Sequence, residues 1–310
     1  TSDFVEIEKM LFSRGYYQSS ENSPNKTPLS PVVELLIAKR DNIIAAADAD
    51  AQIEALKNQD VRRDFDRYFY RSSFKQQHSL SISGGSDIQR FYLSAGYDEN
   101  LENAVGNSFG RVTFNANNIN RLLNRKLEIT TGIYYTQSKR DLNNQGMSSV
   151  RVSTNQVLYP YAQLADPTGT PLSVTRDYRR SFVASAGTLG LENWEYNPLE
   201  ELRLSNNESS MIDCRLNAGA KYHLGSSLNA EVLYQYGRGQ SNNRNVRSAE
   251  SYYVRDLINQ YTQLNTATGV FTRAVPLGGI LDQQASMTDV HNLRGQLNLN
   301  HSWRDKHTVN

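Results

Sequence analysis

The side chains that most often carry out chemistry in proteins match no catalytic or metal-binding pattern in this sequence. The five histidines form neither an HExxH motif nor a comparable ligand spacing. Four glutamates fall within one predicted loop: Glu192, Glu195, Glu200 and Glu201. Carboxylates act in pairs in glycosidases, but only when a rigid scaffold holds them at a defined separation, and this loop shows no such scaffold. The sequence therefore predicts no enzyme, no resident metal ion and no cofactor.

Aromatic side chains in two long polar segments, residues 139–210 and 239–290, are better candidates for a binding site. Flat rings stack on the apolar faces of sugars or peptides, while neighbouring Asn, Gln, Asp and Arg side chains bond hydroxyls or amides. The sequence predicts ligand contacts for five of these residues: Trp194, Tyr196, Tyr252, Tyr253 and Tyr261. The alternative is that the rings pack the loops against one another.

The composition limits the classes of function. The 310 residues carry a formal net charge of +1, so no strong field favours nucleic acid as a partner. Cys214 is the single cysteine, and an internal disulfide is therefore impossible. No stretch approaches the roughly 20 apolar residues of a membrane-spanning helix.

The first 73 residues are predicted to be helical. Ser30 and Pro31 give an N-cap followed by a first-turn proline, which predicts that a helix begins there. A further amphipathic helix is predicted over residues 48–69.

After Phe74 the apolar period changes from 3.6 to 2, the period of strands with one apolar face. An eighth strand is predicted to follow a tight turn at 304–306. The seven main strand candidates are residues 76–83, 88–97, 110–118, 126–138, 211–223, 227–238 and 291–304.

The connections between these strands alternate between short turns and long loops. Strands of about ten residues with short turns at one end and long loops at the other are typical of outer-membrane β-barrels. An antiparallel sheet with one face on a core and the other in water is the alternative. Loops of 50 to 70 residues are uncommon in compact soluble domains, so the loop lengths favour the barrel.

Several segments resemble one transporter family. The segment QQHSLSISGGSDIQRFYLSAGYDE resembles an early-barrel segment of SusC/RagA-type TonB-dependent outer-membrane transporters, in which QQHNLSxSGGS followed by YYxSxGY is typical. The segment NPLEELRLSNNESSMIDCRLNAGAKYHLGSSLNAEVLYQYG resembles the next such segment, and SYYVRDLINQYTQ and PLGGILD resemble loops of the family. The resemblance covers most of the chain.

The resemblance implies an all-β fold, namely a partial membrane β-barrel of antiparallel up-and-down transmembrane strands with long extracellular loops and an N-terminal helical segment. Residues 1–73 would form an extracellular helical and loop segment. Residues 74–310 would supply seven or eight of the roughly 22 barrel strands. The chain would be an internal barrel fragment, without the plug and the C-terminal strands, and we expect it to be unstable alone because two sheet edges would remain unpaired.

The resemblance also implies a function. The chain would be part of a TonB-dependent importer of oligomeric nutrients, glycan or peptide, in the outer membrane of a Gram-negative cell. Its implied partners are outer-membrane lipid, a SusD-like surface lipoprotein, an oligosaccharide or peptide ligand, and TonB through the plug. The alternative is a surface carbohydrate-binding or adhesin β-protein without transport activity, which should stay folded without detergent.

Overall fold

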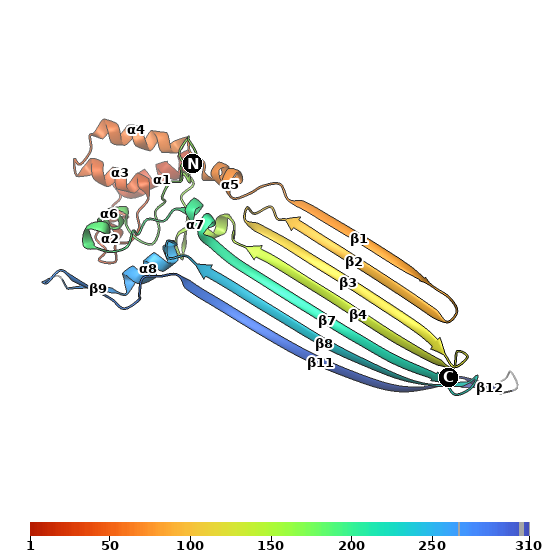
Figure 1. Cartoon of the computed structure of the whole chain (residues 1–310). Coiled ribbons are helices and arrows are strands. Elements are labelled where there is room, and N and C mark those ends of the chain that lie inside the picture. Colours follow the sequence, from red (N-terminus) through yellow and green to blue (C-terminus); the bar gives the residue numbers. More distant parts are fainter. Residues whose placement is uncertain (266, 304–306, 310) are drawn as a thin grey trace.

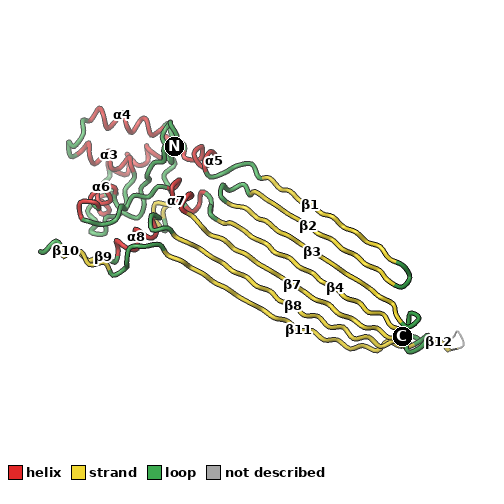
Figure 2. The backbone as a smooth tube through the Cα atoms, viewed as in Figure 1, coloured by secondary structure: helices red, strands yellow, loops and turns green. Residues whose placement is uncertain are grey.

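A long antiparallel sheet carries a helical cap at one of its ends (Figure 1). The structure is a computed structural model that describes residues 1–265, 267–303 and 307–309. The cap lies at the end of the sheet where the long loops emerge, and the short turns lie at the opposite end (Figure 2). We call these the loop side and the turn side of the sheet.

All seven predicted main strands are present, and each pairs antiparallel with its neighbour along the sheet. The predicted bounds of the two long loops, 139–210 and 239–290, are too wide, because strand structure continues to Leu142 and resumes at Ser205 in the first and continues to Arg247 and resumes at Ile280 in the second. The strand order is β1-β2-β3-β4-β7-β8-β11, and the sheet is not closed, because β1 and β11 lie at its two edges. The strands are β1 (Phe74–Gly85), β2 (Gln89–Leu101), β3 (Asn107–Leu122), β4 (Leu127–Leu142), β7 (Ser205–His223), β8 (Leu228–Arg247) and β11 (Ile280–Leu299).

The strand register gathers the apolar side chains on one face. Residues directly opposite one another in an antiparallel pair point to the same side of the sheet. One such row runs across five strands through Leu93, Ala116, Ile133, Leu216 and Tyr236. The alternation of apolar and polar residues therefore produces a single continuous apolar face, as predicted.

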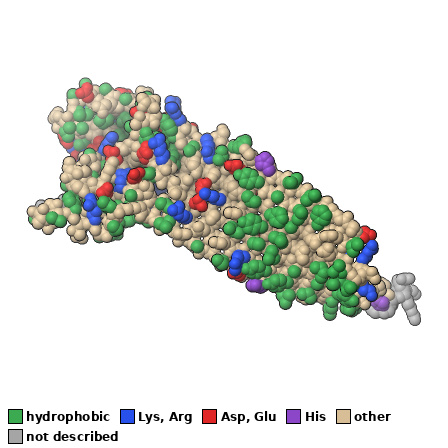
Figure 3. Space-filling model, viewed as in Figure 1, with side chains coloured by type: hydrophobic (Ala, Val, Ile, Leu, Met, Phe, Trp, Pro, Cys, Tyr) green, Lys and Arg blue, Asp and Glu red, His purple; other side chains and the backbone are tan. Residues whose placement is uncertain are grey.

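No layer of the described chain covers this apolar face. Leu80 is 77% exposed, Leu293 76% and Leu297 73%. Figure 3 shows the hydrophobic side chains gathered on the exposed strands, in the part of the sheet away from the cap. The strands thus lack the second layer that the core of a soluble sheet needs.

The opposite face of the sheet is polar. One register row places Asn117, Gly132, Asn217, Gln235 and Asn292 side by side on five strands. Asn292 Nδ2 donates to Gln235 Oε1 at 3.2 Å, and Gln235 Nε2 donates to Asn217 Oδ1 at 2.8 Å. Four of these five residues carry a side-chain amide and none is charged, so this face has an uncharged row of amide groups.

The hairpin between β1 and β2 requires a glycine. Gly85 has a φ of 149°, and a Cβ atom built there would lie 2.2 Å from the carbonyl oxygen of Gln89. A side chain at this position would collide with backbone rather than with a movable side chain. The Gly-Gly pair in the sequence therefore marks a tight turn.

The N-terminal helices begin with two clear caps. Ser30 accepts a hydrogen bond from the backbone N–H of Val33 at 3.2 Å, and Pro31 occupies the first turn, as predicted. The single helix predicted over residues 48–69 is wrong, because the segment forms two helices. Asp60 interrupts it by accepting from the backbone N–H of Arg62 at 3.1 Å, which starts a new helix.

The remaining elements are short. The N-terminal helices are α1 (Ser2–Ser13), α2 (Gln18–Glu21), α3 (Pro31–Arg40), α4 (Ala46–Lys57) and α5 (Val61–Tyr68). The long loops contain η1 (Met147–Ser149), β5 (Arg151–Ser153), β6 (Gln156–Val157), α6 (Arg180–Ser185), η2 (Gly187–Leu189), α7 (Pro198–Leu204), α8 (Tyr252–Gln260), β9 (Thr262–Asn265) and β10 (Val270–Arg273). Among the described residues, no helix combines the length and the apolar composition that crossing a bilayer would require.

The predicted eighth strand is present as β13 (His307–Val309), but it pairs with β12 (His301–Trp303) in a separate two-stranded sheet and does not extend the seven-stranded sheet. The predicted turn at 304–306, like residue 310, lies outside the described residues.

Residues that are far apart in the sequence build the core of the cap. One buried cluster contains Val5 of α1, Phe65 of α5, Val152 and Tyr161 of the 139–210 loop, and Tyr252 of α8. All five side chains are at most 4% exposed. The N-terminal segment, the 139–210 loop and α8 therefore fold around one common core.

A buried carboxyl group joins α1 to this core. Glu8 is 4% exposed, and its Oε2 accepts a hydrogen bond of 2.6 Å from the hydroxyl of the fully buried Tyr161. Burial raises the pKa of Glu8, although hydrogen bonds from Ser30 and Tyr161 partly oppose the shift. Burial likewise raises the pKa of Tyr161. The contact is therefore a hydrogen bond between a buried acid and a neutral phenol.

We predict that Glu8→Gln stabilises the docking of α1 at neutral pH. The pKa of Glu8 is raised in the folded state. Its contribution to stability is therefore fully present below its unfolded pKa of about 4.3, and it is lost as the pH rises through the folded-state pKa. Glutamine accepts the same hydrogen bond without titrating. Hydrogen exchange of α1 amides, compared between the two proteins at matched pH, should show a difference at neutral pH that vanishes in acid. A difference that is independent of pH would contradict this account.

Candidate functional site

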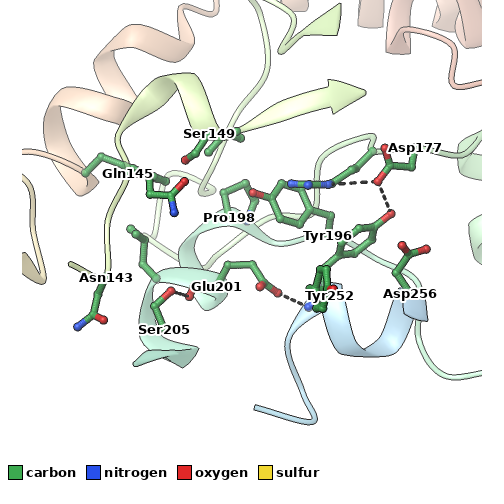
Figure 4. A pocket seen from close by; sticks show the side chains of 15 residues that line it. Asn143, Gln145, Ser149, Asp177, Tyr196, Pro198, Glu201, Ser205, Tyr252 and Asp256 are labelled. Carbon is green, nitrogen blue, oxygen red and sulfur yellow. Dashed lines mark hydrogen bonds and ion pairs between the residues drawn. The ribbon is translucent and has the colours of Figure 1, made fainter. Parts of the chain in front are cut away.

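A polar cavity of about 230 Å³ lies where the cap meets the loop side of the sheet (Figure 4). Its walls come from α7, from the start of α8, and from loop residues between β4 and α7. Asn143, Gln145 and Ser149 contribute amide and hydroxyl groups, and Tyr253 contributes an aromatic ring. The cavity therefore offers both hydrogen-bonding groups and ring surface.

The helix α7 positions one acidic wall of the cavity. The side chain of Asn197 accepts from the backbone N–H groups of Leu199 and Glu200 at 3.2 and 3.3 Å, and Pro198 fills the first turn. An N-cap asparagine followed by proline is a strong start signal for a helix. This start places Glu201 in the first turn of α7, facing α8.

Glu201 in turn caps α8. Its Oε1 accepts from the backbone N–H of Tyr252 at 2.7 Å, whereas the side chain of the N-cap residue Ser251 makes no capping bond. Burial raises the pKa of Glu201, while the Tyr252 N–H and the nearby Arg255 act in the opposite direction. The helix N-terminus stabilises the carboxylate there, so this interaction fixes α8 against α7.

A guanidinium held between two rings forms the next wall. Arg176 lies 4.4 Å from the ring centroid of Tyr196 and 5.0 Å from that of Tyr252, within the range of cation–π attraction. The two rings meet edge to face at 5.2 Å. Asp177 accepts from the Arg176 Nε at 3.3 Å and from the Tyr252 hydroxyl at 3.0 Å. The cation is thus enclosed by rings and neutralised on one side.

A second aromatic group backs the cavity. The indole of Trp194 packs against Tyr178 and Phe182, with ring centroids 4.7 and 5.4 Å away. Its Nε1 donates to Asp256 Oδ1 at 2.9 Å, so both ends of the tryptophan are fixed. Asp256 also lines the cavity. The 139–210 loop and α8 are therefore joined by rings and by a hydrogen bond.

The five aromatic residues predicted to contact ligand fall into two groups. Trp194, Tyr196 and Tyr252 come together, and they are 5%, 7% and 4% exposed within the cap core. Tyr253 and Tyr261 are 51% and 56% exposed. Tyr253 lines the cavity and lies under the guanidinium of Arg247 at 4.2 Å. Ligand contact remains a prediction for all five, and Tyr253 has the most accessible ring at the cavity.

Four charged residues line the cavity but are not binding candidates from the sequence alone: Arg176, Asp177, Glu201 and Asp256. Arg176 and Asp177 stand in a loop without periodicity, where nothing local indicates that rings enclose them. Glu201 was considered only as an acid for catalysis. The Asn-Pro pair at 197–198 is the local signal that could have located Glu201, because it predicts the start of α7.

The polar groups and the ring surface of the cavity suit recognition of a polar solute. Three carboxylates line the cavity, and each already accepts a hydrogen bond: those of Asp177, Glu201 and Asp256. Among the described residues, no group of His, Cys, Asp or Glu is arranged to hold a metal ion. What the cavity offers a ligand is amide, hydroxyl and carboxylate groups beside an aromatic face, the composition of a site for a polar solute.

Comparison with protein-family models and with curated proteins gives no match for this chain. The fold is similar to a chain of a solved structure described as the RagAB peptide transporter, with a TM-score of 0.56 and 14% identity over 81% of this chain and 24% of that chain. Chains of the RagAB peptide importer in the closed-closed and open-open states give TM-scores of 0.46 at 16% identity. They cover 61% and 60% of this chain and 20% and 19% of theirs. The chain thus spans about a quarter or less of the length of these transporter chains.

We predict that two aromatic residues, one in the cap core and one at the cavity, contribute very differently to the stability of the cap. Trp194→Ala should destabilise the cap by about 3–5 kcal/mol, because it empties a buried ring site. Tyr253→Ala should cost less than about 1 kcal/mol, because its ring is half exposed and its cation–π contact is with Arg247 at the surface. Hydrogen exchange of α8 amides in the two variants measures the difference. Equal losses would contradict the division into core and accessible rings.

Proposed function

We propose that this chain supplies part of the wall and the outer loops of a TonB-dependent importer in a bacterial outer membrane. The bare apolar face of the seven-stranded sheet is the observation that carries the proposal. Leu80, Leu293 and Leu297 are each more than 70% exposed, and no described segment covers them. Contiguous apolar surface on this scale is typical of a protein or membrane interface rather than of a soluble monomer.

The shape of the apolar band supports lipid as the covering medium. On β2 the band runs from Phe91 to Tyr97, and on β11 from Leu293 to Leu299. The register places Phe91, the turn-side end of the band on β2, level with Leu293, the loop-side end on β11.

The band is therefore oblique to the strands. It shifts by six residues over the five steps from β2 to β11. At about 3.4 Å per residue and about 4.8 Å between strands, the shift is about 20 Å along the strands over about 24 Å across the sheet. The resulting angle of about 40° matches the tilt of strands in transmembrane barrels. A planar apolar medium crossing tilted strands would produce this slant.

Tyrosines mark the loop-side border of the band. The hydroxyl groups of Tyr97 and Tyr135 donate to Glu99 at 3.2 Å and to Gln137 at 2.9 Å. Each ring thus lies among apolar neighbours while its hydroxyl reaches the polar zone beyond them. Amphipathic rings of this kind gather at membrane–water interfaces.

The import role draws on the similarity of the fold to part of a RagAB chain and on the polar inner face. We propose that a SusD-like surface lipoprotein covers the cap, that TonB acts through a plug outside this chain, and that the ligand is an oligosaccharide or a peptide. The polar cavity beside Tyr253 is the proposed contact point for that ligand. The uncharged amide row would line the wet interior of the wall.

Uptake measurements test the transport proposal directly. Cells producing the complete protein should accumulate labelled oligopeptides or oligosaccharides, and an uncoupler of the proton gradient should stop the accumulation. When the uncoupler has dissipated the proton gradient, the same cells should still bind the ligand at their surface. Surface binding without energy-dependent accumulation would instead favour the adhesin.

We predict that one matched pair of substitutions on β8 reports lipid contact. Val232→Arg, in the middle of the apolar band, should destabilise the membrane-inserted protein by about 2–4 kcal/mol. Leu233→Arg makes a similar change at the next residue but on the polar face, and it should be tolerated. Unfolding in detergent or lipid vesicles measures both effects. Equal sensitivity of the two positions would argue against a lipid-facing band.

A further inference from the structure

A second cavity lies outside the cap, on the apolar face of the sheet. This open groove of about 610 Å³ crosses β7, β8 and β11 near the loop-side border of the apolar band. Its floor includes Leu216 and Ala218, and the rings of Tyr234 and Tyr236 stand beside them. One end carries three polar side chains: Arg238, Asp289 and His291. The groove therefore combines an apolar trough with a polar end.

The charges at the polar end are arranged to leave donors available. Asp289 accepts from Arg238 Nε at 2.7 Å, from Arg238 Nη2 at 3.3 Å and from the Tyr236 hydroxyl at 2.7 Å. Its negative charge is thus largely compensated. Arg238 gives Asp289 two of the five N–H donors of a guanidinium, and its side chain is 55% exposed.

The imidazole of His291 is held beside this pair. Its Nδ1 lies 2.8 Å from the Tyr234 hydroxyl, and its ring packs against Tyr236 with centroids 5.0 Å apart. When the hydroxyl donates to Nδ1, the neutral ring carries its hydrogen on Nε2. Nε2 is then a second donor at the same end of the groove as Arg238.

We propose that this groove binds a membrane amphiphile whose phosphate headgroup contacts Arg238 and His291 and whose acyl chain lies along the floor. The proposal rests on the proposed function, because it requires the apolar face to lie in lipid. A guanidinium and an imidazole N–H suit a phosphate, which has only acceptors to offer. The floor continues into the apolar band through Leu293, which is opposite Tyr234 in the register, and this gives an acyl chain an unbroken path.

An anion without an apolar tail would leave the floor of the groove unused. A cationic headgroup is disfavoured, because Asp289 is already engaged by Arg238 and Tyr236. The polar end and the apolar floor together therefore select an anionic amphiphile, and we commit to a phosphorylated membrane lipid held at the loop-side boundary of the membrane.

The test uses the complete protein in lipid nanodiscs of phosphatidylcholine with a minor fraction of phosphatidic acid. Native mass spectrometry counts the phosphatidic acid molecules that each variant retains. Arg238→Gln should lower this retention by roughly tenfold, the effect of losing one charge-assisted hydrogen bond. Asp289→Asn should raise it, because the counter-charge of the guanidinium is removed.

Arg215→Gln is the matched control. Arg215 lies on the neighbouring strand β7, on the opposite face, and pairs with Asp213 at 2.9 Å. This variant should retain phosphatidic acid as the unaltered protein does. Equal losses in Arg215→Gln and Arg238→Gln, lower retention in Asp289→Asn, or full displacement of the lipid by inorganic phosphate would each overturn the proposal.

Phosphatidylcholine separates failure of this site from failure of the proposed function. If the sheet lies in lipid but the groove has no headgroup site, the protein inserts and retains phosphatidylcholine and phosphatidic acid without preference, which overturns the amphiphile site alone. If the sheet does not face lipid, the protein stays outside the nanodiscs and retains neither lipid, which overturns both.

Discussion

The apolar face of the sheet must be removed from water, and the rest of the structure depends on that constraint. A period of two over seven strands places every second side chain on the same face, and each aliphatic side chain buried there contributes about 1.5–3 kcal/mol. If any strand slipped by one residue against its neighbour, its apolar side chains would point to the polar face of the sheet. The strand register is thus strictly determined, although no layer of the described chain covers the apolar face. In the proposed importer, lipid would act as the missing half of the core.

The cap, in contrast, buries its apolar side chains in a core of its own. The connections between β4 and β7 (residues 143–204) and between β8 and β11 (residues 248–279) would be an entropic burden if they had no structure of their own. Here they share one core with the N-terminal helices, and their rings fill it: Trp194 packs on Phe182, and Tyr196 meets Tyr252. The polar groups taken into this core are bonded in pairs, such as Tyr161 with Glu8. The residues that line the polar cavity are therefore held in place by the packed core of the cap.

The sequence predicted the strands and their antiparallel order well, but it did not predict how the cap assembles. Strand positions followed from alternation, and the helix at Pro31 from its cap, because both signals lie within a few residues of the feature they specify. The break at Asp60 was missed because the apolar period of the two helices continues across it. The common core of α1, the 139–210 loop and α8 left no such trace, since contacts between distant segments have no periodic signature. For the same reason, the sequence could not tell that Trp194 is buried and Tyr253 accessible.

The common core of the cap also sets an order of events during folding. Val5 and Tyr252 belong to one buried cluster, so the first helix cannot complete its packing until the chain has been made as far as α8. Until then its apolar side chains have only local partners, and closing so long a loop makes this a late and slow step. The hairpins β1–β2 and β3–β4, in contrast, join neighbours in the sequence and can pair early. The helix α1, although it precedes the sheet in the sequence, is therefore among the last elements to reach its final place.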